Sequence, residues 1–77
     1  MTHKEKMETY KNLGGESGVS AFEIGLNYIK VKFSTGAIYK YSYAKAGKMH
    51  VDEMKLLAQR GRGLNSYINT NVKFLYD

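Results

Sequence analysis

Lysines that alternate with apolar or aromatic residues are the clearest candidates for chemistry in this 77-residue chain. Lys30 and Lys32 occur in the stretch IKVKF, which starts at residue 29, and Lys40 occurs in YKYSY, which starts at residue 39. Successive side chains of a β-strand point to opposite faces, so this alternation gathers the lysines on one exposed face. A row of ammonium groups, which are donors without an acceptor, attracts phosphates. The spacing therefore predicts a surface that binds an anionic partner.

Charge segregation extends this surface along the chain. The net charge is +5, the isoelectric point is about 9.5, and no acidic residue occurs between Glu23 and Asp52. Such segregation creates a positive field over one part of a surface, and nucleic acid is the commonest partner for such a field. The candidate contacts are Lys30, Lys32, Lys40, Lys45, Lys48, Arg60 and Arg62, with Tyr28 as a surface on which a base could stack.

The sequence has no pattern that is typical of a catalytic or metal site. It contains no cysteine, and its two histidines, His3 and His50, are far apart. Asp52 and Glu53 are the only adjacent acids, and neighbouring residues of a helix do not face each other. We expect a non-enzymatic binding module with no cofactor and no metal.

The two lysine-bearing stretches predict a β-hairpin, and the length of its loop decides which face is buried. A three-residue loop that ends at a left-handed Gly36 places Lys30 opposite Lys40 and turns the tyrosines of the second strand toward the core. A two-residue loop would instead bury Lys40 and expose the tyrosines among lysines, as a platform on which bases could stack. It would also need a positive φ at Thr35, which a β-branched residue resists. Slippage by one residue flips every side chain to the other face. We favour the three-residue loop.

The rest of the chain supplies the other elements of a small α+β fold. Residues 19–24 alternate apolar and polar side chains and predict a first strand. Apolar residues at helical spacing predict a main helix over residues 48–60, with Gly61 as its C-cap. A short helix over residues 64–72 and an extended tail over residues 73–77 close the core. We expect a three-stranded antiparallel β-meander, covered on one face by the main helix and the short C-terminal helix.

The N-terminal segment is predicted to lie outside this domain. Met7, Tyr10 and Leu13 are spaced three apart, which indicates a weak amphipathic helix, and a pair of glycines follows. We expect residues 1–15 to be flexible or short-helical and residues 16–77 to form one small domain.

Composition also predicts the compartment. The sequence contains no apolar run of membrane-spanning length, and its first residues lack the pattern of a secretory leader. The absence of cysteine fits a reducing environment. We expect a cytoplasmic protein without a membrane partner.

These features together resemble the KTSC domain, which is named for the C-terminal domain of some lysyl-tRNA synthetases and also occurs as small stand-alone proteins. The resemblance covers about residues 19–76 and rests on Ile29, Val31, Phe33, Gly36, Tyr39, Tyr41, Leu57, Ala58, Gly61, Asn65 and Ile68. The family commonly has a proline between the second strand and the helix, where this chain has AKAG from residue 44. The resemblance implies RNA binding, which is suggested by the attachment to synthetases, and no catalytic residues.

Two functions are consistent with these patterns. The first is binding of RNA or single-stranded nucleic acid by the lysine-rich sheet face. The second is a protein–protein interaction or structural role, in which the open sheet face or an edge strand pairs with a partner protein. The sequence leaves the partner and the oligomeric state open.

Overall fold

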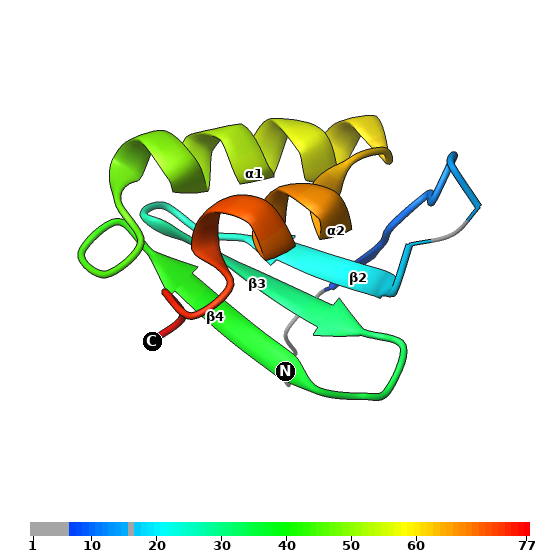
Figure 1. Cartoon of the computed structure of the whole chain (residues 1–77), viewed down its shortest axis with the longest axis horizontal. Helices are drawn as coiled ribbons and strands as arrows, with labels where there is room; N and C mark the ends of the chain where they lie inside the picture. Colours follow the sequence, from blue (N-terminus) through cyan, green and yellow to red (C-terminus); the bar gives the residue numbers. More distant parts are fainter. Residues whose placement is uncertain (1–6, 16) are drawn as a thin grey trace, which may run out of the picture.

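The structure, a computed structural model, describes residues 7–15 and 17–77. These residues form an antiparallel sheet of four strands in chain order, with helices on one face (Figure 1). The strands are β1 (Glu8–Thr9), β2 (Val19–Ile24), β3 (Tyr28–Phe33) and β4 (Ile38–Ser42). The helical elements are α1 (Lys48–Arg60), α2 (Leu64–Tyr67) and the wider π-helical turn η1 (Ile68–Val72). The predicted α+β class is confirmed, with one strand more than expected.

The hairpin between β3 and β4 has the three-residue loop, and the two-residue alternative is wrong. Gly36 has a φ of 98°, and its N–H donates to the carbonyl of Phe33 at 2.8 Å. The N–H of Phe33 in turn donates to the carbonyl of Ala37 at 2.8 Å. Glycine adopts this left-handed conformation without a steric penalty. As a result Lys30 pairs with Lys40 across the two strands.

The core lies between the inner face of the sheet and the helices. Tyr41, with 1% of its surface exposed, packs in one buried cluster with Val51 and Met54 of α1. Burial raises the pKa of Tyr41 to about 12, with smaller contributions from Tyr39 and Tyr76. Of the two β4 tyrosines that sequence alternation assigned to the core, Tyr41 is a central part of it, whereas Tyr39 is 38% exposed and the prediction is wrong for this residue.

The C-terminal helical turns close the core, whereas the tail does so only in part. Leu64, Ile68 and Val72 recur at every fourth residue and are all buried. Tyr76 packs its ring against the tyrosines of β4. Phe74 is 75% exposed, and Leu75 and Tyr76 remain 36% and 38% exposed, so the prediction that the tail closes the core is wrong for Phe74 and holds only in part for the other two.

The N-terminal segment docks on the domain, and its helical interpretation is wrong for residues 7–15. Strand β1 pairs with the edge of β2, and Tyr10 after it is only 3% exposed. The hydroxyl of Tyr10 accepts a hydrogen bond from the N–H of Leu64 at 3.2 Å. Strand pairing satisfies main-chain groups of both segments, and this long-range gain outweighs a weak local helix pattern. Residues 1–6 of the predicted segment lie outside the described residues.

Helix α1 has the predicted bounds and the predicted C-cap. Gly61 is left-handed, with a φ of 82°, and its N–H donates to the carbonyl of Leu57 at 2.9 Å. A Cβ at this position would lie 2.7 Å from the Cβ of Lys11, so glycine also permits the close approach of the N-terminal segment. Within the described part of the chain, no helix is both long and apolar enough to cross a membrane.

Candidate nucleic-acid interface

Three of the predicted contacts share the sheet face that lies opposite the helices. Lys30, Lys32 and Lys40 alternate along β3 and β4 with residues that point into the core. Lys30 lies across from Lys40, and Lys32 lies across from Ile38, which is 52% exposed. Figure 1 shows α1 and α2 together on the other side of the sheet. We name Lys30, Lys32, Lys40 and the neighbouring Tyr28 the lysine face.

Tyr28 lies among the ammonium groups of this face. The Nζ atoms of Lys40 and Lys30 are 4.9 Å and 6.0 Å from the centre of its ring, which is the range of cation–π attraction. Its hydroxyl donates to Oε2 of Glu23 at 2.7 Å. The ring lies directly over Gly25, where an added Cβ would come within 2.1 Å of a ring carbon. Glycine and carboxylate together therefore fix the ring beside the two lysines.

Carboxylates also border this face, although the sequence interval between Glu23 and Asp52 contains none. Glu23 lies directly across from Lys30 in the β2–β3 pairing, and its Oε1 is buried without a hydrogen-bond partner among the described residues. At the opposite edge, Asp77 accepts a hydrogen bond from the hydroxyl of Ser42 at 2.7 Å. The expectation of an acid-free surface is therefore wrong, because strand pairing and tail docking bring distant acids to it.

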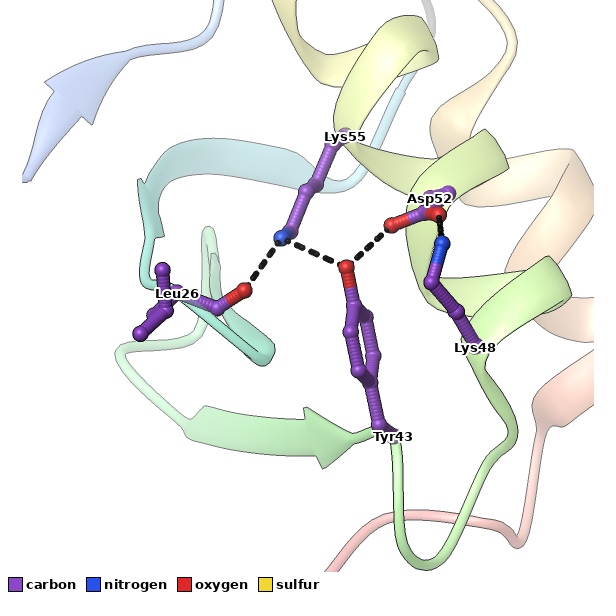
Figure 2. Close-up of polar contacts among 5 residues, drawn as sticks. All are labelled: Leu26, Tyr43, Lys48, Asp52 and Lys55. Carbon is purple, nitrogen blue, oxygen red and sulfur yellow. Dashed lines mark hydrogen bonds and ion pairs between the residues drawn. The ribbon is translucent and has the colours of Figure 1, made fainter.

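A second group of lysines surrounds Tyr43, just after β4 (Figure 2). The hydroxyl of Tyr43 donates to Oδ1 of Asp52 at 2.6 Å, and the ammonium of Lys48 binds Oδ2 at 2.8 Å. Lys55 donates to the carbonyl of Leu26 at 3.3 Å and to the hydroxyl of Tyr43 at 3.4 Å. We name these five residues the Tyr43 clamp. It joins the β2–β3 turn to the first turns of α1.

Electrostatics within the Tyr43 clamp follow from these bonds. Hydrogen bonds from Lys48 and then Tyr43 lower the pKa of Asp52 below its ordinary value. The same bond to Asp52 raises the pKa of Lys48. Both shifts favour the charged pair, so the positive charge of Lys48 is compensated inside the molecule.

The remaining predicted contacts divide between the two sides of the sheet. Lys45 follows β4, and its N–H donates to Ser42, so it lies beside the lysine face. Lys48 belongs to the Tyr43 clamp. Arg60 is the last residue of α1, and Arg62 lines a cavity of about 180 Å³ at the start of α2. The two arginines lie at the helix ends, as predicted from the sequence, and therefore in the helical layer and not on the lysine face itself.

Sequence reasoning missed two features of these sites. The pairing of Lys48 with Asp52 was signalled by their four-residue spacing in a predicted helix. The approach of Lys55 to Tyr43 had no comparable local signal, since it depends on how α1 crosses the sheet. Among the residues that the structure describes, no group of three or more histidines, cysteines or acids could hold a metal ion.

Comparisons with known proteins identified no relative of this chain. The chain matches no family model, no curated protein and no solved structure. The resemblance to the KTSC domain therefore stays a prediction.

Proposed function

We propose that this protein is a non-enzymatic binding module for RNA or another single-stranded nucleic acid, and that the lysine face is its contact surface. The observation that carries this proposal is the placement of two lysine ammonium groups around one fixed tyrosine ring, on a sheet face opposite the helices. Lysines hold phosphates, and an aromatic ring stacks on an unpaired base. The proposed KTSC-like character of the chain points to the same partner.

The chemistry of the face favours single strands and weak sequence preference. Stacking on a tyrosine needs an unpaired base, and every base has a π-face. Lysine contacts to phosphate position a strand without reading its sequence. Glu23 acts within the molecule by holding the Tyr28 hydroxyl, and its negative charge limits the net attraction.

The expected salt dependence follows from the number of lysines. Each phosphate contact on a single strand contributes about −0.7 to the slope of log affinity against log salt. The three lysines of the face therefore give a slope of roughly −2, and adding Lys45 gives roughly −3. Contacts this few indicate weak binding.

The test is fluorescence anisotropy with a labelled mixed-sequence RNA 20-mer at several salt concentrations. Lys30→Ala combined with Lys40→Ala should lower affinity for all sequences alike and flatten the salt slope by about 1.4. The control removes equal charge from the helical side, by Lys11→Ala combined with Arg60→Ala, both of which are exposed. An equal loss in both variants would show that only net charge matters and that the lysine face is no site.

A second candidate function is protein interaction at the edge of β4. The carbonyl of Lys40 accepts a hydrogen bond at 2.8 Å from the N–H of Asp77, so a main-chain acceptor on this edge is in reach of a segment outside the sheet. An added strand from a partner protein would use the same main-chain groups. If no RNA or DNA strand binds even at low salt, this function replaces the first.

A further inference from the structure

A groove lies on the helical side of the sheet, apart from the lysine face. It has a volume of about 260 Å³ and opens between β4, η1 and the C-terminal tail. The residues that define its chemistry are Phe33, Tyr39, Tyr41, Lys73, Phe74 and Tyr76. We name it the aromatic groove.

The rings of this groove are already arranged for stacking. Tyr39 and Tyr76 have centroids 4.8 Å apart, and Phe33 meets Tyr39 edge-on at 5.7 Å. Tyr39 and Tyr76 each remain 38% exposed, and Phe74 is 75% exposed. Aromatic surface of this extent, next to a cavity, offers a flat apolar partner a place to bind.

Charge at the groove selects the kind of partner. The ammonium of Lys73 lies 5.5 Å from the centre of the Phe74 ring, and none of the described residues that line the groove is acidic. The nearest acid along the tail, Asp77, is held by Ser42. A flat ring that carries a negative group therefore fits better than a purely apolar side chain. Asn69 at the groove adds an amide that can bond the polar edge of such a ring.

The groove and the lysine face lie on opposite sides of strand β4, which is an outer strand of the sheet. Tyr39 lines the groove, and the next residue, Lys40, stands on the lysine face. Because successive side chains of a strand alternate, one strand presents a ring to one side and an ammonium to the other. The volume is below the roughly 300–1,000 Å³ of pockets for drug-sized ligands, so it suits a single ring system.

We propose that the aromatic groove is a subsite for one unpaired nucleobase, with Phe74 and Tyr76 as the stacking surface and Lys73 as the contact to its phosphate. This inference rests on the proposed binding of single-stranded nucleic acid and names a second place where that strand is held. Base stacking is tolerant of sequence, so the subsite reads the presence of a base rather than its identity.

The test compares two labelled 12-nucleotide single strands by anisotropy. One has mixed sequence, and in the other every base is replaced by an abasic site, so that both carry the same phosphates. The protein should bind the base-containing strand more tightly. Phe74→Ala should lower the affinity for that strand by roughly 5- to 150-fold, which is the range for the loss of one stacking aromatic. The affinity for the abasic strand should not change. Met49→Ala, another exposed apolar residue at 80% exposure, is the matched control.

The possible outcomes separate the subsite from the lysine face. Normal salt-dependent binding that Phe74→Ala leaves unchanged would overturn the subsite while the proposed function stands. An equal loss for both strands would overturn it too, because the groove would then contact only the backbone. Binding of neither strand by the unmodified protein would overturn both proposals. Because Phe74 is so exposed, the variant should melt at the same temperature as the unmodified protein.

Discussion

Two tyrosines, Tyr28 and Tyr43, are held by the same kinds of groups in different parts of the molecule. Each hydroxyl donates to a carboxylate, that of Tyr28 to Glu23 at 2.7 Å and that of Tyr43 to Asp52 at 2.6 Å. Each ring has two lysine ammonium groups near it, at 4.9 Å and 6.0 Å for Tyr28 and at 5.0 Å and 5.5 Å for Tyr43. The parts of the two clusters are therefore alike.

The difference between them is whether both lysine ammonium groups, or only one of them, make hydrogen bonds or ion pairs inside the molecule. At Tyr43, Lys48 binds a carboxylate, and Lys55 bonds a carbonyl and the hydroxyl. At Tyr28, the exposed Lys40 has the ring beside it but no hydrogen bond or ion pair from its ammonium within the described ranges 7–15 and 17–77. The same residue types thus bond to one another around Tyr43, whereas beside Tyr28 they leave the ammonium of Lys40 available to an anion from outside the molecule.

The largest effect is expected from the core residue next to Lys40. Tyr41→Ala should lower the free energy of unfolding by ~3 kcal/mol or more, because truncating a buried aromatic leaves a cavity. Lys40→Ala should change it by ~0.5 kcal/mol or less, as is usual for surface sites. Urea denaturation followed by circular dichroism measures both, and the reverse order would contradict the observed register.

Removing one hydroxyl from each cluster sharpens the comparison. Tyr28→Phe should cost about 1–3 kcal/mol of unfolding free energy, because Glu23 already has one buried oxygen without a partner among the described residues. Tyr43→Phe should cost about 0.5–1.5 kcal/mol, since Asp52 keeps its bond to Lys48. Thermal melts of the two variants decide the order, and a greater loss at Tyr43 would refute this account of Glu23.

Neutralising lysines should separate binding from stability. At about 0.15 M salt, Lys30→Ala with Lys40→Ala should weaken RNA binding about tenfold through two lost phosphate contacts. Lys48→Ala with Lys55→Ala removes the same charge from the Tyr43 clamp and should weaken binding less while lowering the melting temperature. Equal losses of affinity would mean that the two clusters do not differ in function.

The smallest effect is expected from the pH dependence of the exposed clamp pair. The pKa of Asp52 is lower in the folded protein, so its stabilising contribution is present above the unfolded value and is lost as pH falls through the folded value. Asp52→Asn should therefore be less stable than the unmodified protein at pH 7, and this gap should shrink below about pH 4. Denaturation curves at both pH values measure the gap, and a constant gap would show that Asp52 acts by packing alone.

Local patterns were enough to predict the hairpin and the main helix. The register of β3 and β4 followed from alternation and from the need for a left-handed Gly36, and the end of α1 followed from Gly61. Both depend on residues that are close in the sequence. Alternation and the loop that ends at Gly36 together therefore assigned the lysines of the face to one side of the sheet.

The features that sequence reasoning missed depend on contacts between distant segments. Strand β1 is only two residues long and exists because β2 offers an edge, so its sequence carries no alternation to detect. Glu23 reaches Tyr28 through the tight turn at Gly25, and Asp77 reaches Ser42 through the folded tail. The absence of acids between Glu23 and Asp52 in the sequence therefore did not predict which acids lie beside these residues in the fold.

The way the sheet ends has a consequence for self-association. Exposed strand edges are templates on which a second copy of a chain can pair and aggregate. Here one outer strand, β1, is two residues long, and the other, β4, has Lys40 at its centre and the N–H of Asp77 bonded to its main chain. The tail beside β4 is visible in Figure 1. A short strand, a charged residue and a docked tail thus protect a small sheet from growing into a fibril.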